Sequence, residues 1–128
     1  MKEYKIGFGT EFDKDQSCIP VAELKRALDR IKHNAMIGFG GFTLIDCDGG
    51  WVNDNNVHVL EKGKQISLIY HAAKNVRDFA AYVCVKLNQE SVVLILPDGT
   101  VEFISVEPSD QWSGCDIGES KPIYDGHG

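Results

Sequence analysis

The sequence lacks the short motifs that indicate a defined chemistry. Its four cysteines are widely spaced and form no C-x-x-C pair, and its four histidines form no H-E-x-x-H or close His/Cys cluster. It has no G-x-S-x-G elbow and no G-x-x-x-x-G-K-[ST] phosphate loop. The sequence therefore predicts no metal site, no cofactor and no nucleophilic catalysis. It favours free thiols in a reducing compartment.

Long hydrophobic runs and an excess of positive charge are also missing. The longest apolar runs are too short to span a bilayer, and the first residues, MKEYKIGFG, contain no signal-peptide core. We therefore expect a cytoplasmic protein without a membrane partner. The formal net charge of −6 argues against a long nucleic acid as partner. A small anion is not excluded, because two or three well-placed cations are enough to bind one.

The hydrophobic pattern predicts a strand and a helix in the first third of the chain. Apolar residues alternate with polar residues and glycine over residues 4–8, which is typical of a strand. A stripe at spacings of three and four then predicts a helix, with core residues Val21, Leu24, Leu28 and Ile31. Pro20 suits the start of this helix. We expect it to end near His33 and Asn34, before Gly38.

The remaining pattern completes one α+β domain over residues 1–106. Residues 41–70 read as a run of antiparallel strands with turns at 48–50, 53–56 and 61–64. A second helix is predicted over residues 71–87, with the core face Val76, Phe79, Ala80, Val83 and Leu87. Cys84 should be a packed thiol in this helix. Two strands follow, around a turn at 97–99.

The resulting order, β-α-β-β-α-β-β, predicts a ferredoxin-like antiparallel sheet with two helices packed on one face. The other face of such a sheet is bare, so we expect a homo-oligomer, a dimer or higher. Residues 107–128 lose all periodicity, yet they contain Trp112, Ile117 and Tyr124, which are costly to expose. They are predicted to form an extended arm over a pocket or a neighbouring subunit.

Residues 38–54, GFGGFTLIDCDGGWVND, raise the question of a phosphate loop. Such a loop places glycines between a strand and the start of a helix. Here the predicted helix precedes the glycines and a strand follows them, so the order is reversed. We interpret Gly38, Gly40 and Gly41 as a helix end with its loop, and residues 48–50 as a hairpin turn.

Candidate ligand-binding residues are chosen by side-chain chemistry. In an acidic protein, arginines on a helix face could bind phosphates, although a solvated face is the simpler interpretation for each. Trp51, or Tyr82, could stack on a base, and amides at a sheet end could read a base edge or ribose. The candidate set is Arg26, Arg30, Trp51, Asn53, His58, Arg77, Asn88 and Gln89.

Three segments resemble a known group of proteins. YKIGFG at the start, GFTLIDCDGGWVNDNN in the middle and LNQESVVLI near residue 90 are similar in style to phage anti-Thoeris sponge proteins. This resemblance spans residues 4–96. It implies a phage protein in the host cytoplasm that is not an enzyme and that oligomerises. It further implies that the protein sequesters a nucleotide-derived immune signal, a cyclic ADP-ribose isomer or a cyclic oligonucleotide.

Two alternatives from other classes stay open. One is a small dimeric α+β barrel enzyme, in which His58 or His71 would act as the base. The other is a phage inhibitor module that binds a host protein through Trp112 and Tyr124 of the arm.

Overall fold

The structure is a computed structural model, which describes residues 1–52, 55–56 and 58–106. The predicted arm at 107–128, and with it the predicted domain boundary, lies outside the described residues. The elements follow the predicted order. They are β1 (Lys2–Gly9), α1 (Val21–Phe39), β2 (Thr43–Val52), β3 (His58–Tyr70), α2 (Ala73–Lys86), β4 (Val92–Ile95) and β5 (Val101–Ile104).

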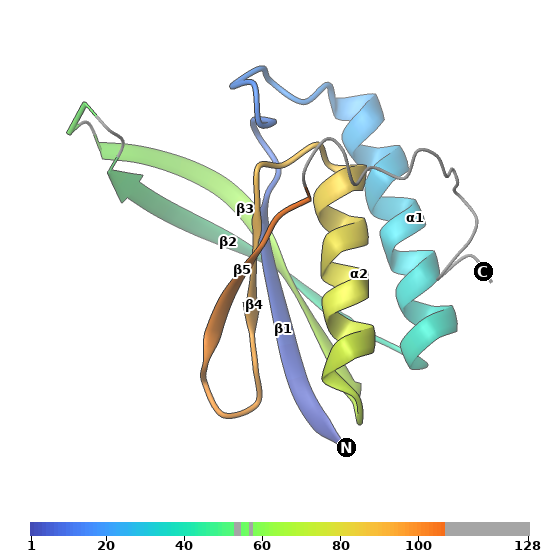
Figure 1. The fold of residues 1–128 in the computed structure, drawn as a ribbon. Helices are drawn as coiled ribbons and strands as arrows, with labels where there is room; N and C mark the ends of the chain where they lie inside the picture. The colour runs from blue at the N-terminus through green and yellow to red at the C-terminus, as the bar shows by residue number, and fades with distance from the viewer. Residues whose placement is uncertain (53–54, 57, 107–128) are drawn as a thin grey trace.

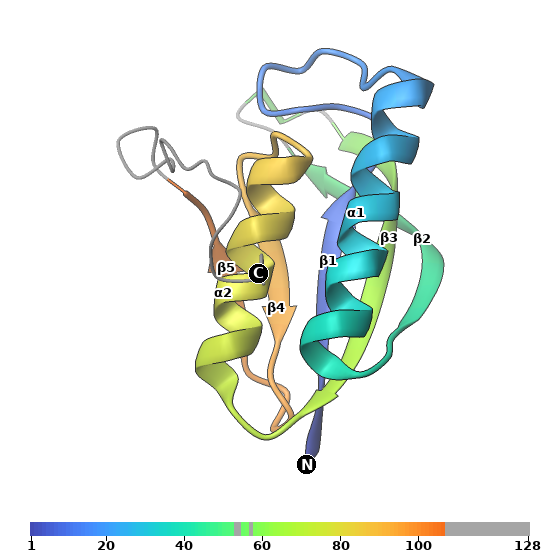
Figure 2. The same cartoon turned by 90° about the vertical axis from the view of Figure 1, so that its right-hand side faces the viewer.

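The five strands form one antiparallel sheet in the order β2-β3-β1-β4-β5. Both helices cover the same face of this sheet, as Figures 1 and 2 show. The first four strands have the ferredoxin-like arrangement, and β5 extends it as the hairpin partner of β4. The predicted fold class is therefore confirmed. We call the face away from the helices the open face.

The core lies between the helices and the sheet, and β1 is its centre. Ile6 of β1 sits opposite Ile66 of β3 on one side and Leu94 of β4 on the other, and all three are fully buried. From α2, the core receives the predicted residues Val76, Phe79, Ala80, Val83 and Leu87. Cys84 is also buried, as expected for a packed thiol. Because strand side chains alternate, the residues between these positions on β1 face the open side.

Helix α1 begins after Pro20 as predicted, but it ends later than predicted and one of its predicted core residues is exposed. It continues through Gly38 to Phe39, beyond the predicted end near His33, and it stops at Gly40, whose φ of 80° is left-handed. Gly40 is thus the helix-ending glycine, because a residue without a Cβ adopts this conformation without strain. Val21 is 82% exposed, so it does not belong to the core stripe. The burial instead runs through Leu28, Ile31 and Ala35.

Strands β2 and β3 form one long hairpin that projects beyond the helices (Figure 1). The turns predicted at 48–50 and 61–64 are wrong, since Asp48 pairs with Lys62 and Gly49 with Glu61 inside the ladder. Cross-strand ion pairs of Asp48 with Lys62 and of Asp46 with Lys64 accompany this pairing. The chain reverses between Val52 and His58 instead. Residues 55–56 of the turn predicted at 53–56 fall in this interval, and residues 53–54 lie outside the described part.

Among the described residues, no helix combines the length and apolarity needed to cross a membrane.

The revised stripe of α1 can be tested by stability measurements. Ile31 is 1% exposed, so Ile31→Ala should lower the free energy of unfolding by about 2–5 kcal/mol, the usual cost of a cavity in a core. Val21→Ala, in the first turn of the same helix, should change it by less than about 0.5 kcal/mol. Urea unfolding followed by circular dichroism would measure both. Equal costs for the two variants would contradict the helix orientation described here.

Candidate functional site: a glycine-floored hollow on the open face

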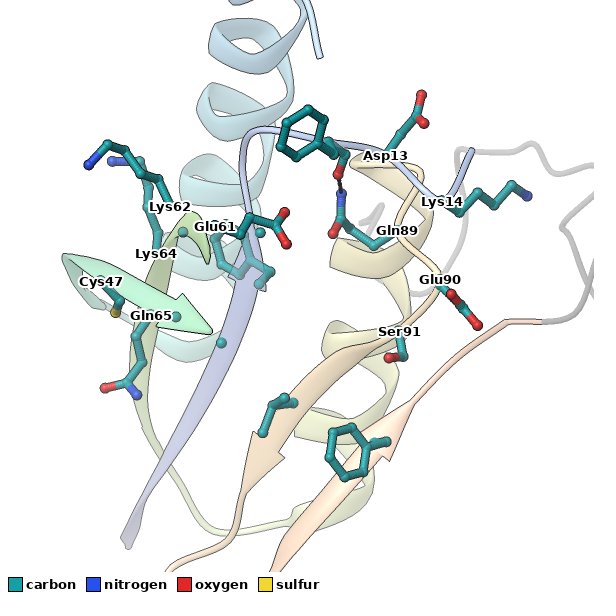
Figure 3. A pocket seen from close by; sticks show the side chains of 18 of the residues that line it. Asp13, Lys14, Cys47, Glu61, Lys62, Lys64, Gln65, Gln89, Glu90 and Ser91 are labelled. Atoms are coloured by element: carbon teal, nitrogen blue, oxygen red, sulfur yellow. Dashed lines mark hydrogen bonds between the residues drawn. The ribbon is translucent and has the colours of Figure 1, made fainter. Parts of the chain in front are cut away.

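A hollow of about 800 Å³ lies on the open face of the sheet. Its floor is formed by β1 and β3, and β2, β4 and β5 contribute to its sides. The loop after β1 and the connection from α2 to β4 close its upper end, as Figure 3 shows. Residues from all five strands and from two connections therefore meet here. Such a concave site between strand ends and loops is typical of small-molecule binding.

Glycines make this hollow possible. Gly7 and Gly9 of β1, Gly49 of β2 and Gly63 of β3 all line it. Gly9 and Gly63 are direct partners in the ladder. Because none of them carries a side chain, the sheet backbone itself is accessible from the open face. A Cβ on Gly63 would collide with the backbone carbonyl of Phe8, so this position accepts no larger residue without a shift of the ladder.

Gly9 provides room for two polar side chains. A Cβ built on Gly9 would collide with a carboxylate oxygen of Glu61 and would lie 2.8 Å from its carboxylate carbon. The same point lies 3.2 Å from Oε1 of Gln89. Figure 3 shows Glu61 and Gln89 facing the same space from opposite sides of the end of β1. The missing side chain of Gly9 therefore leaves a small recess with oxygen atoms from β3 and from the α2–β4 connection.

The Glu61 carboxyl has an unusual electrostatic environment. Burial raises its pKa above the ordinary value of 4.5, and the neighbouring Glu11 raises it further, while a hydrogen bond from the Phe12 backbone acts in the opposite direction. Glu11 is itself held by the backbone N–H of Lys62, which donates to its carboxylate at 2.7 Å. A partly desolvated carboxyl in a concave site is a frequent feature of functional sites.

Gln89 is fixed by hydrogen bonds on several sides. Its Nε2 donates to the carbonyl oxygens of Phe12, at 2.9 Å, and Leu87, at 3.1 Å. The backbone carbonyl of Gln89 accepts a hydrogen bond from the buried Cys84 thiol at 3.1 Å. Burial raises the pKa of that thiol. Next to it, Asn88 has a φ of 51° and accepts a bond from the Lys14 N–H at 2.8 Å. The α2–β4 connection and the loop after β1 are thereby joined.

The lysines near the hollow are directed elsewhere. Nζ of Lys62 lies 3.5 Å from Asp48, and Lys64 pairs with Asp46, whose pKa that contact lowers. Figure 3 shows both lysine side chains pointing away from Glu61. Glu61 and Gln89 therefore present acceptors to the recess beside Gly9, while Lys62 and Lys64 are turned toward other carboxylates.

The structure separates most of the predicted ligand-binding residues. Gln89 lines the hollow, and Asn88 precedes it with an exposed side chain. Arg26 and Arg30 are exposed on α1, in the helical layer on the far side of the sheet. Arg77 of α2 makes a bidentate ion pair with Glu102 at 2.8 and 2.9 Å, which raises the pKa of Arg77 and lowers that of Glu102. A shared site for these arginines stays a prediction.

Other candidates fall where less can be said. Asn53 lies outside the described residues, and the side chains of Trp51 and His58 are not among those described, although both residues belong to the β2–β3 hairpin. His71 is exposed beside Tyr70, with ring centroids 4.4 Å apart, and is not part of the hollow. Tyr82 of α2 stacks on Phe79 at 5.9 Å on the helical side.

Comparison with known proteins gives a fold relative. No known protein family and no curated protein match the chain. Two solved structures of a phage SAM lyase are similar. In complex with S-methyl-5'-thioadenosine, the lyase has a TM-score of 0.60 at 16% identity, covering 83% of this chain and 90% of that chain. In the apo state, the lyase has a TM-score of 0.56 at 16% identity, covering 82% of this chain and 89% of that chain. At this identity the likeness shows the fold.

This comparison corrects the function expected from the sequence. The expectations of a non-catalytic anti-Thoeris sponge and of a protein that is not an enzyme are contradicted, because the protein that shares the fold is a lyase. The broader expectation, a phage protein that binds a small nucleotide-like ligand, agrees with the comparison, because the phage lyase of the same fold holds S-methyl-5'-thioadenosine.

Glu61 and the floor glycines were missed by sequence reasoning. The sequence pattern places Glu61 in a turn, and in it Gly7 and Gly9 only alternate with Ile6 and Phe8. The available signal was this alternation, since glycines on one face of a predicted strand often mark the close approach of a ligand.

The environment of Glu61 predicts a specific pH dependence of stability. Between the unfolded and the raised folded pKa, the folded state holds a proton that the unfolded state has released. The contribution of Glu61 to the free energy of unfolding therefore falls as pH rises through 4.5, and it stops falling once the pH exceeds the folded pKa. Glu61→Gln removes this loss, so the variant should gain stability relative to the wild type over that window. Urea unfolding at a series of pH values would measure it.

Glu102 serves as the matched control of opposite sign. Arg77 lowers the pKa of Glu102, so its stabilising contribution is present above 4.5 and is lost as pH falls through the folded pKa. Glu102→Gln should accordingly lose stability relative to the wild type as pH rises from the lowered folded pKa of Glu102 to 4.5. Parallel pH profiles for the two variants would contradict the environment assigned to Glu61.

Proposed function

We propose that the protein is a lyase that binds S-adenosylmethionine in the hollow and releases S-methyl-5'-thioadenosine. The observation that carries this proposal is the glycine-floored hollow with its partly buried Glu61, in a fold shared with a phage SAM lyase. A phage origin and action in the host cytoplasm are part of the proposal, supported by the phage origin of the two neighbours.

The named product defines the bond that breaks. S-methyl-5'-thioadenosine keeps the methyl and adenosyl groups of the sulfonium, so the bond between sulfur and the γ-carbon of the amino-acid portion is cleaved, and its electron pair stays on sulfur. A lyase uses no water. The substrate's own carboxylate can attack the γ-carbon and form a five-membered lactone, which balances atoms and charge without a protein nucleophile. This route fits a sequence in which no nucleophile motif was found.

The hollow offers what such a reaction requires. A carboxylate and a sulfonium neutralise each other as the new bond forms, so a site less polar than water favours the transition state over the separated charges. Phe12 of the loop, Val93 and Ile95 of β4 and Phe103 of β5 supply apolar lining. The backbone of Gly7 and Gly9 allows close approach of the ligand, and Glu61 supplies a carboxylate for one of its positive charges.

Turnover of S-adenosylmethionine by purified protein tests the proposal directly. We expect S-methyl-5'-thioadenosine by liquid chromatography, with mass spectrometry to identify the four-carbon fragment. Glu61→Gln should lower kcat/KM by roughly 10- to 100-fold, because a hydrogen bond to a charged group contributes about 1.5–3 kcal/mol.

Glu3→Gln is the control, since Glu3 lies on the open face of the neighbouring strand β1 but outside the hollow, and its substitution changes the net charge equally. It should retain wild-type kcat/KM within about threefold. Absence of cleavage by the wild-type protein would refute the proposed activity, and equal effects of the two substitutions would refute the role of Glu61.

We also propose that the open face mediates self-association. Large apolar side chains from three strands are half exposed or more on this face: Ile45 of β2, Ile69 of β3, and Val101 and Phe103 of β5. Exposed apolar side chains that share one face of a sheet favour a protein interface on that face. A second copy of the chain would cover it.

Analytical ultracentrifugation should therefore detect a dimer or a larger assembly of the wild-type protein. Ile69→Asp, which places a charge on the apolar surface outside the hollow, should weaken this assembly by at least tenfold in Kd, while the fold remains intact by circular dichroism. If the wild-type protein stays monomeric at 100 times the protein concentration of the turnover assay, the proposed interface is contradicted.

A further inference from the structure

The amide of Gln89 has a fixed orientation. Both hydrogens of its Nε2 are used, one for the carbonyl of Phe12 and one for the carbonyl of Leu87. Its Oε1 is consequently the end that lies against Gly9, at 3.2 Å from the position of a Cβ there. Rotation of the amide by 180° would break both bonds. Gln89 therefore presents the recess with an acceptor and not with a donor.

Glu61 presents the same recess with a second acceptor. Its carboxylate occupies the space that a Cβ on Gly9 would take. The peptide groups of Phe12 connect the two side chains, because the Phe12 backbone hydrogen-bonds to Glu61 and its carbonyl accepts from Gln89. The loop after β1 thus holds both oxygens in place. The lysines of the adjoining strand, Lys62 and Lys64, are paired with carboxylates of β2 and point away.

We propose that Gly9, Glu61 and Gln89 form a cation subsite, which binds the positively charged centre of an adenosyl ligand and discriminates against its neutral thioether. A carboxylate and a fixed carbonyl oxygen stabilise a cation, whereas an uncharged sulfur gains little from them. This inference rests on the proposed function. Beyond that function, the inference states that cleavage removes the sulfonium charge and thereby weakens the binding of the thioether product at this subsite.

The subsite should also affect binding more than the chemical step. A carboxylate beside a sulfonium stabilises the bound substrate at least as much as a transition state in which the positive charge is already fading. Loss of Glu61 should consequently raise KM and leave kcat within about threefold. A merely structural role for Glu61 would lower the amount of active protein instead, and kcat would fall with KM unchanged.

Calorimetric titration with three unreactive ligands tests the subsite on the full chain. S-methyl-5'-thioadenosine carries no positive charge near sulfur, 5'-deoxy-5'-dimethylsulfonioadenosine carries a sulfonium only, and S-adenosyl-3-thiopropylamine carries an ammonium only. At least one cationic ligand should bind the wild-type protein tenfold or more tightly than the neutral one. The ligand that does so identifies whether the sulfonium or the ammonium occupies the subsite.

Three variants then assign the preference to this recess. Glu61→Gln removes the charge and Gln89→Met removes the fixed oxygen. Gly9→Ala adds a methyl group that collides with the Glu61 carboxylate and displaces it from Gly9, while both groups stay present. Each should bring the ratio of cationic to neutral affinity to within about threefold of one. Glu3→Gln should keep the wild-type ratio. Gly9→Ala retains the bonds of Gln89, so it tests the subsite even if Gln89→Met fails to fold.

The possible results separate the two proposals. Equal affinities of the wild-type protein for all three ligands, together with cleavage of S-adenosylmethionine, would overturn the cation subsite and leave the proposed function standing. A charge preference that survives both Glu61→Gln and Gly9→Ala would also overturn the subsite. No binding of any of the three ligands and no cleavage would overturn the proposed function and this inference with it.

Discussion

The structure depends on β1, because this strand must present apolar side chains on one face and glycines on the other. Toward the helices, β1 presents Ile6 and Phe8 to the core, and toward the open face it presents Gly7 and Gly9 to the hollow. The side-chain period of a strand is two, so a shift of register by one residue would exchange these faces. The ladders with β3 and β4 therefore fix the core and the hollow together. Disruption of one necessarily disrupts the other.

The rim of the hollow is held in a different way from its floor. The loop after β1 contributes little to the core, and hydrogen bonds position it instead. Thr10 donates to the carbonyl of Lys62 at 3.1 Å, Lys14 to that of Asn88, and Gln89 to that of Phe12. These bonds tie the loop to β3 and to the α2–β4 connection at separate points. A rim fixed by directional bonds can place individual oxygen atoms precisely, which burial alone does not achieve.

The sequence allowed the fold to be predicted well and the site poorly, for a physical reason. Periods of two and 3.6 are local, so the order of strands and helices and the core face of α2 could be deduced. The β2–β3 hairpin was divided wrongly because Asp48, Gly49 and Gly63 are common in turns, and only the opposite strand shows that they are paired. The recess combines Gly9, Glu61 and Gln89 from three elements, and no spacing along the chain relates them. Gln89 was named for its amide alone.

The scarcity of catalytic motifs is consistent with the chemistry proposed for the hollow. Attack of the substrate's own carboxylate on the γ-carbon, with the sulfonium sulfur as leaving group, needs no protein nucleophile, base or metal. It needs a folded conformation and a setting less polar than water. The burial that raises the pKa of Glu61 reports such a setting, because it disfavours a separated charge for the same reason that it favours two charges neutralising each other. A site of the proposed kind would act through shape and desolvation. Its signal in the sequence would be strand glycines and core packing, which a search for reactive side chains does not detect.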